Sequence, residues 1–249
     1  MVIKKKLMQI GGLVIAMAAL MNFTSCLRAL NKTNAGDIER LLQEKYGIEF
    51  QVISIGNRLA SPSMDTVTAY CSPKNNNRVV FEAKMNVASE LVSDDFIERY
   101  IDVQAEEQLE IFFQNFGMET TVKVDIYPIP DAIDYQSANY KQVLQSSSDI
   151  SFTFTTVLRE TNGDRKMYDA LQALFMEYYE INNRIPMGTT IWHIKQETYE
   201  DCSKEMRRKP FPSKTFYENY SPLGSAIVSS QKGIPNISYK EFHDQLFSN

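Results

Sequence analysis

The sequence predicts an α+β fold, in which helices pack on one face of an antiparallel sheet. Some segments carry apolar residues at helical spacing, other segments alternate apolar and polar residues, and turn-forming residues separate neighbouring segments. Hydrophobic residues make up 43% of the chain and aromatic residues 11%, which is typical of a folded globular protein.

The first half of the chain begins with a predicted helix and continues as an antiparallel meander. Apolar residues recur at helical spacing over 34–46, and Gly47 is placed to end that helix. Turn residues separate three strand-like segments, which lie at 48–55, 65–71 and 78–85. The longest apolar stripe predicts a helix over 94–116, and strict alternation predicts a strand over 120–127.

The second half of the chain shows the same kinds of strand and helix pattern. Alternation predicts strands over 149–159 and 189–198, and a helical pattern covers 164–181 between them. The pattern fades after Asp201, where four prolines punctuate a region expected to be irregular, and a short helix is predicted over 238–247. We therefore expect a single α+β domain over 35–249, and the similarity in style leaves open two similar lobes at 35–130 and 131–249.

The N-terminus has the pattern of a secretory signal. Three lysines precede an apolar run from Leu7 to about Leu20, and small residues follow. The run is shorter than the roughly 20 residues that a membrane-spanning helix needs. We therefore expect residues 1–25 to be removed as a signal peptide.

The residues at the cut indicate a lipid anchor. Phe23-Thr24-Ser25-Cys26 resembles the lipobox of Bacteroidota lipoproteins, with Phe23 where stricter lipoboxes carry leucine. The resemblance covers the first 26 residues and implies lipidation of Cys26 by diacylglycerol and a further acyl chain such as palmitate. Several acyl chains hold a protein firmly to a membrane. The expected location is the cell envelope, facing the periplasm or the cell surface, with residues 26–34 as a tether. No domain family is identified over 35–249.

The charge of the mature chain excludes one class of partner. Removing residues 1–25 takes away three lysines and no acid, so the formal charge changes from −5 to −8. An acidic body repels phosphate backbones and anionic headgroups. We therefore expect no nucleic-acid partner.

Two cysteines, Cys71 and Cys202, remain after processing. Export places them in an oxidising compartment, where a pair can form a disulfide. A bridge requires Cα atoms within about 7 Å, which sequence does not reveal. Both a bridge and two free buried thiols stay open.

No complete motif for catalysis or metal binding is present in the sequence. The two histidines, His193 and His243, lack the H-E-x-x-H spacing, and no G-x-S-x-G or Walker A loop occurs. Glu106, Glu107 and Glu110 form a carboxylate row on the polar side of the long helix, where a solvated face is expected. We therefore expect no catalytic residue, no metal and no cofactor.

Aromatic residues suggest a recognition surface. Tyrosine and phenylalanine in irregular segments offer a large contact area at low entropic cost. The candidate surface combines Trp192 with Phe211, Phe216, Tyr217 and Tyr220. The alternative is that these rings cover the sheet.

The sequence leads to three functional hypotheses. The first is a non-enzymatic lipoprotein that binds another protein, for instance an immunity protein against an exported toxin. The second is a lipoprotein that binds a glycan or small molecule through the aromatic surface. The third is a metal-dependent hydrolase that uses His193 and His243.

Overall fold

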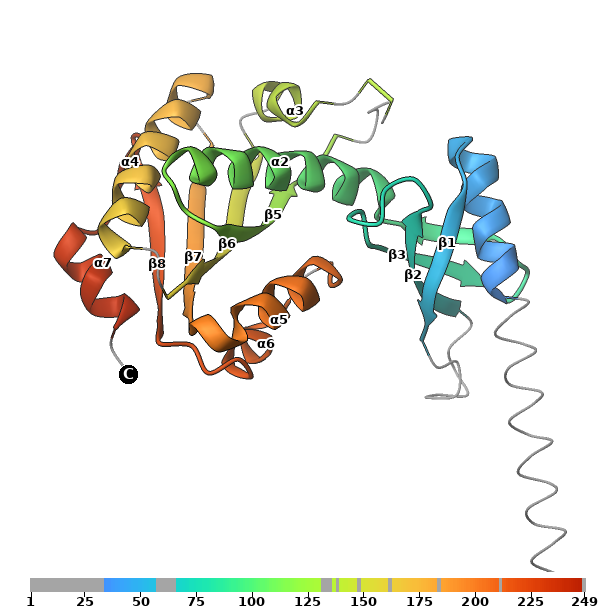
Figure 1. The fold of residues 1–249 in the computed structure, drawn as a ribbon. Helices are drawn as coiled ribbons and strands as arrows, with labels where there is room; N and C mark the ends of the chain where they lie inside the picture. Colours follow the sequence, from blue (N-terminus) through green and yellow to red (C-terminus); the bar gives the residue numbers. More distant parts are fainter. Residues whose placement is uncertain are drawn as a thin grey trace, which may run out of the picture. The chain divides into compact units, whose positions relative to one another are not determined.

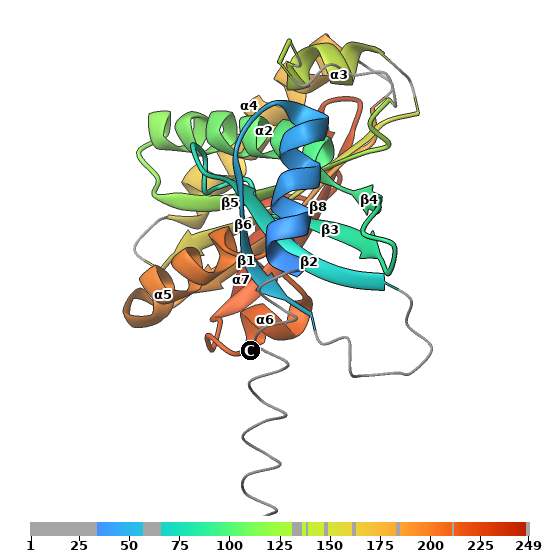
Figure 2. The same ribbon diagram turned by 90° about the vertical axis from the view of Figure 1, so that its right-hand side faces the viewer.

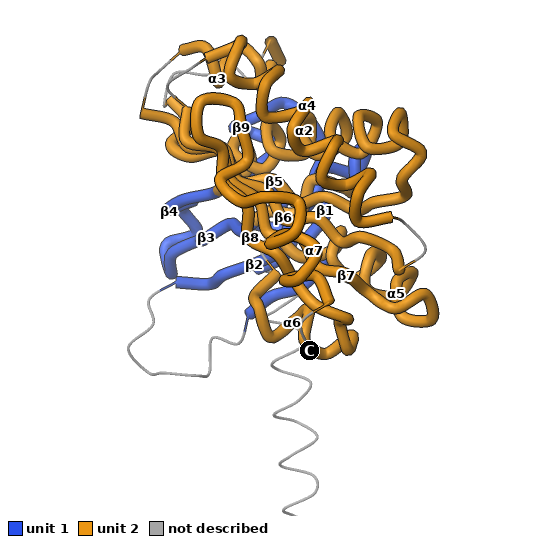
Figure 3. The backbone as a smooth tube through the Cα atoms, turned by 90° about the vertical axis from the view of Figure 1, so that its left-hand side faces the viewer, with its two compact units in different colours: residues 1–77, 82–94 blue, residues 78–81, 95–249 orange. Residues whose placement is uncertain are grey.

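The chain folds into two compact units. In the computed structural model the described residues are 34–56, 66–130, 136–137, 139–146, 149–160, 163–182, 185–210 and 212–247. One unit comprises residues 1–77 and 82–94, and the other comprises 78–81 and 95–249 (Figure 3). The expected signal peptide over 1–25, the lipobox-like residues with Cys26 and most of the expected tether lie outside the described residues.

The first unit is a helix on a four-stranded sheet. The helix covers residues 34–46 and lies across the sheet (Figure 2). The strands follow the order β1-β2-β3-β4, and they are β1 (Phe50–Ile55), β2 (Thr66–Pro73), β3 (Phe81–Asn86) and β4 (Leu91–Asp94). Ile38 and Leu42, one helical turn apart, are both fully buried. At the end of the helix the hydroxyl of Tyr46 donates to the carboxylate of Asp94, which ties the helix to β4.

The second unit contains a five-stranded sheet in the order β5-β6-β7-β8-β9. Its elements are α2 (Phe96–Asn115), β5 (Thr120–Tyr127), α3 (Tyr140–Ser146), β6 (Ser151–Arg159), α4 (Asp164–Ile181), β7 (Met187–Ile194), α5 (Gln196–Arg207), α6 (Lys214–Glu218), β8 (Gly224–Gln231), β9 (Ile234–Pro235) and α7 (Tyr239–Leu246). Strands β6 and β7 pair in parallel, because α4 carries the chain back between them, and the other pairs are antiparallel.

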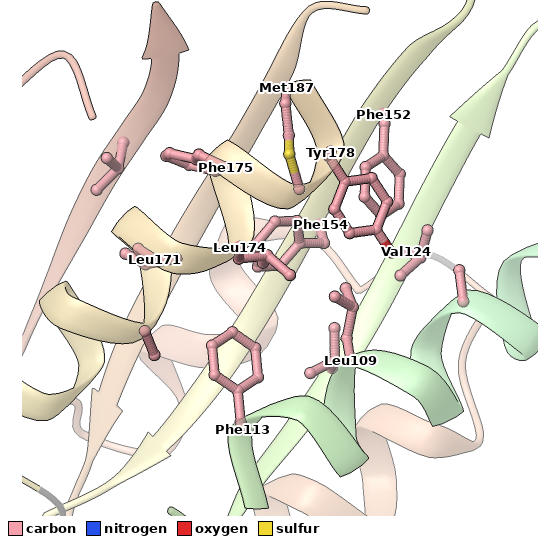
Figure 4. Close-up of a cluster of buried hydrophobic side chains, with 14 of the residues drawn as sticks. Leu109, Phe113, Val124, Phe152, Phe154, Leu171, Leu174, Phe175, Tyr178 and Met187 are labelled. Atoms are coloured by element: carbon pink, nitrogen blue, oxygen red, sulfur yellow. The ribbon is translucent and has the colours of Figure 1, made fainter. Parts of the chain in front are cut away.

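Helices α2, α4 and α7 cover one face of this sheet and form the main core (Figure 1). Phe113 of α2 and Leu174 of α4 lie close to Phe154 of β6 (Figure 4). Phe152 stacks on Tyr178 with ring centroids 4.9 Å apart. Each fully buried large side chain of this kind contributes about 1.5–3 kcal/mol relative to an exposed one.

Helices α5 and α6 cover part of the opposite face (Figure 1). Trp192 and Ile194 of β7 point to this side and contact a smaller cluster from α5 and α6. The cluster members on these two helices are Tyr199, Cys202, Met206 and Tyr217. The sheet is therefore enclosed on both faces at one end of its strands.

The open edge of β5 is closed by side chains of α2. Acidic side chains of the helix accept hydrogen bonds from alternate backbone N–H groups of the strand, which runs the opposite way. Asp102 accepts from Ile126 at 3.0 Å, Glu106 from Val124 at 3.3 Å and Glu110 from Val122 at 3.3 Å. Four helical residues rise about 6 Å, close to the nearly 7 Å that two strand residues span, so the two series stay in register.

Buried cations balance these carboxylates. Arg99, with no exposed surface, donates to Asp102 and to Glu106 at 2.9 Å each. The ammonium of Lys123 lies 3.6 Å from Glu106. The expectation that Glu106 would be solvated is therefore wrong, because this side chain replaces a missing neighbour strand. Glu107 and Glu110 are half-buried.

The predicted α+β class is confirmed, and the structure adds detail that the pattern did not predict. The chain does not divide at residue 130, because β5 pairs along its whole length with β6 on the other side of that position. The strand expected over 189–198 ends at Ile194, since α5 begins at Gln196. Helices α5 and α6 and strand β8 occupy the region that was expected to be irregular.

Candidate functional site

The aromatic residues predicted as a surface gather around α6. Trp192 and Tyr217 are stacked, with centroids 5.1 Å apart and ring planes at 10°. Phe216 contacts both Tyr217 and Tyr220, at 5.0 and 5.2 Å between centroids. Phe211, the remaining predicted member, lies outside the described residues. Sequence reasoning thus selected residues that come together in space.

Most of this cluster covers the sheet instead of facing solvent. Trp192 is 7% exposed and Tyr217 is 3% exposed, whereas Phe216 and Tyr220 are half-buried. The rings therefore match the alternative in which they cover the strands. Their position matters because one of these rings, Tyr217, lines a pocket on the same face of the sheet.

The floor of this pocket consists of two rows of side chains that cross four strands. Strand register places Lys123, Thr155, Thr190 and Ile227 in one row. The next row contains Asp125, Thr153, Gly188 and Ser229. Along each strand these positions alternate with residues whose side chains point toward α2, α4 and α7. All eight side chains therefore lie on the opposite face, which α5 and α6 leave partly open. Strands lie about 4.8 Å apart and rows nearly 7 Å apart, which makes a flat polar lattice.

The pocket has a volume of about 330 Å³, at the lower end of the range for small-molecule sites. Pro210 and Pro212 from the loop after α5, together with Tyr217, line the side opposite the sheet floor. Gly188 leaves a hollow in the floor, since it carries no side chain. The site therefore combines a polar floor with a mostly apolar wall.

Lys123 is the most unusual group in this site. The residue is 5% exposed, and its ammonium has no hydrogen-bond partner among the described residues, although Glu106 lies 3.6 Å away. Burial lowers the pKa of Lys123 to about 8, and Glu106 opposes that shift. The ammonium itself exposes less than 1 Å² of surface, so it can donate to a ligand once the side chain turns into the pocket.

Burial also disfavours the charged form of the other ionisable groups of the site. Burial raises the pKa of the Asp125 carboxyl above its ordinary value, and Arg99 opposes the shift. Burial also raises the pKa of the Tyr217 hydroxyl, which keeps it neutral and able to donate. The pocket thus offers one cation, one carboxylate and several neutral hydroxyls.

The two cysteines are free thiols buried in different units. Cys71 lies in β2 and Cys202 in α5, and neither has exposed surface. Burial raises the pKa of each thiol to about 12. Of the alternatives that the sequence left open, the structure has two free buried thiols, each enclosed by the core of its own unit.

The two histidines meet at the ring of Phe247. His193 of β7 and His243 of α7 have ring centroids 5.0 and 4.9 Å from that ring. Burial lowers the pKa of His193, while His243 pairs with Asp164. Within the described part of the chain, no group of three or more histidine, cysteine or acidic side chains is arranged to hold a metal ion.

Among the helices whose residues the structure describes, none has both the length and the apolar character needed to cross a membrane.

Comparison with known proteins identifies the fold and nothing finer. No family model matches the chain, and no curated protein matches it. Its fold is similar to the crystal structure of a DUF5037 family protein from Ruminococcus gnavus ATCC 29149, with a TM-score of 0.67 and 18% identity. The match covers 86% of this chain and 99% of that one. At this identity the likeness shows the shared α+β architecture alone.

Sequence reasoning missed the floor of the pocket. The alternation in β5 and β6 identifies Lys123, Thr153 and Thr155 as a polar face, which is ordinarily read as solvated. The sequence feature that could have indicated a site here is a lysine, Lys123, in the middle of a strongly alternating strand. Only the position of α6 turns that polar face into a pocket.

Proposed function

We propose that this chain is an exported, lipid-anchored protein that binds a small polar molecule without converting it chemically. The observation that carries the proposal is the pocket on the half-covered sheet face, with Lys123 buried beside it. Among the described residues the ammonium has an ion pair with Glu106 and no hydrogen-bond partner, so its hydrogen-bonding capacity is unused there. Burying such a group costs free energy, and a ligand that accepts its hydrogen bond would recover part of that cost.

Ligand screening by thermal stability tests this function. A ligand that binds only the folded chain raises its apparent stability, by about 2.7 kcal/mol at a hundred times its dissociation constant. We expect at least one compound from a panel of sugars, amino acids, carboxylates and nucleosides to raise the melting temperature. Substituting Gly188 with valine should abolish that shift by filling the floor. A flat response to the whole panel would count against the proposal.

The anchor is tested separately. We expect the chain expressed in a Bacteroidota host to sediment with membranes and to incorporate labelled palmitate. Cys26→Ser should release it into the soluble fraction and remove the label, because no lipid can then be attached. Membrane association that survives Cys26→Ser would refute lipid anchoring at that residue.

A protein partner, such as a toxin that this chain would neutralise, is the second candidate. It is favoured by Tyr127 and Ile227, exposed at 68% and 69% on the same sheet face as the pocket. Affinity capture from envelope and secreted fractions tests it. One stoichiometric protein that is retained by the native chain but lost with Ile227→Asp would support it. Retention of no protein would oppose it.

A further inference from the structure

We infer that the pocket binds an uncharged, hydroxyl-rich molecule, a neutral sugar, over the two rows of its floor. This inference rests on the proposed function and gives the ligand a chemical class.

The first argument concerns the kind of hydrogen bond that the floor can make. Four of its side chains are hydroxyls, namely Thr153, Thr155, Thr190 and Ser229. A hydroxyl both donates and accepts, whereas an ammonium only donates and an ionised carboxylate only accepts. A ligand with several hydroxyls can match all of these groups at once. A ligand with one charged group would leave most of the lattice without a partner.

The second argument concerns charge. Lys123 already has Glu106 at 3.6 Å, and Asp125 lies two residues along the same strand face, roughly 7 Å away. A ligand carboxylate beside Lys123 would therefore lie close to two protein carboxylates. A ligand ammonium beside Asp125 would face Lys123 in the same manner. Neutral hydroxyls satisfy both side chains without repulsion from either.

The third argument concerns shape. Gly188 opens the floor at the centre of the lattice, and a Cβ placed there would meet Val228 O at an ordinary 3.7 Å. Prolines and the ring of Tyr217 form the opposite wall. A sugar has hydroxyls around its edge and C–H groups on its faces, so its polar edge can bond to the floor while an apolar face contacts the wall.

The test compares probes that differ only in charge. The full chain is purified in a detergent without a sugar headgroup. Binding of glucose, galactose, mannose and N-acetylglucosamine is measured by calorimetry, together with glucuronate, galacturonate and glucosamine. The single tryptophan, Trp192, is stacked on a pocket residue, so its fluorescence gives a second readout. We expect at least one neutral sugar to bind at least tenfold more tightly than its uronate and its amino sugar.

Three variants locate the binding. Gly188→Val adds a side chain to the floor at a position where an added Cβ makes an ordinary van der Waals contact, and Thr155→Val removes one floor hydroxyl at nearly constant shape. Each should weaken sugar binding at least tenfold. Thr121→Val is the matched control, because Thr121 lies on the same face of β5 but outside the pocket, in the row that α5 and α6 cover. It should leave the affinity within twofold.

The outcomes separate the inference from the function on which it rests. Tighter binding of a neutral sugar, lost in Gly188→Val and kept in Thr121→Val, supports both. Binding of uronates or amino sugars in preference to neutral sugars, lost in Gly188→Val, overturns the inference and leaves the binding function intact. Binding that Gly188→Val does not alter, or no binding by any probe or screened compound, overturns both.

Discussion

Two neighbouring glutamates on α2 give a sharp test of how the edge of the five-stranded sheet is closed. Glu106 lies in the buried charge cluster, whereas Glu107 has a side chain that is 45% exposed and 3.7 Å from Arg78. We predict that Glu106→Ala destabilises the chain far more than Glu107→Ala. Both substitutions place alanine in the interior of the same helix, so the gain in helix propensity is similar and cancels in the comparison.

The magnitude follows from the contacts of Glu106. Its carboxylate accepts hydrogen bonds from Arg99 at 2.9 Å and from Val124 N at 3.3 Å, and it is the counter-charge of Lys123. Its removal leaves buried cations under-compensated, which typically costs about 3–5 kcal/mol. An exposed ion pair such as that of Glu107 is worth about 0–1 kcal/mol. We therefore expect a difference of at least about 2 kcal/mol.

Urea unfolding of residues 27–249, followed by tryptophan fluorescence, measures this difference. The single tryptophan lies in β7 of the same unit, so its signal reports the unfolding of the sheet that Glu106 supports. Circular dichroism of the same samples checks that each variant is folded before denaturant is added. Equal losses of stability in the two variants would refute the proposed role of α2 as a substitute strand.

Three further predictions concern buried groups. The stability of the native chain relative to Lys123→Met should rise by about 3 kcal/mol between pH 8 and 10.5, because the folded pKa is about 8 and the unfolded value 10.5, so the unfolded chain binds more protons in that window. Urea titrations across this range measure it, and a constant difference would contradict it. Gly224→Ala should cost about 1–3 kcal/mol, because a Cβ there overlaps a carbonyl in the last turn of α7, whereas Gly163→Ala meets no described atom within 4 Å and should melt close to the native temperature. Comparable melting temperatures for these two variants would disprove that close approach. Cys71 and Cys202 should resist a thiol reagent at pH 8 in the native chain and both react after unfolding without reductant. An unfolded chain without reactive thiols would instead indicate a disulfide.

Local patterns predicted many of the helices and strands because each depends on neighbours in the chain. The helix over 34–46 and strand β5 match their expected bounds, and α4 begins and ends where the apolar stripe does. Alternation and helical spacing report which face of an element is buried, and these elements bury one clear face. Helix α5 was missed because much of its surface is charged and it covers the sheet through a few residues such as Tyr199 and Met206.

The partners of an element depend on contacts between distant segments, which periodicity does not encode. Glu106 and Glu107 look equivalent in sequence, and only the register between α2 and β5 buries the first fully and leaves the second half-buried. The same holds for Cys71 and Cys202, which could be paired or free until each is placed in its own unit.

The sequence by itself determined the α+β class, many of the elements and the expectation of an exported, lipid-anchored chain, because these depend on composition and short-range pattern. The tertiary structure decided where the candidate site lies. A polar strand face becomes a pocket only where α5 and α6 stop covering it, and that limit is set by packing between residues far apart along the chain, such as Val157, Trp192 and Tyr217.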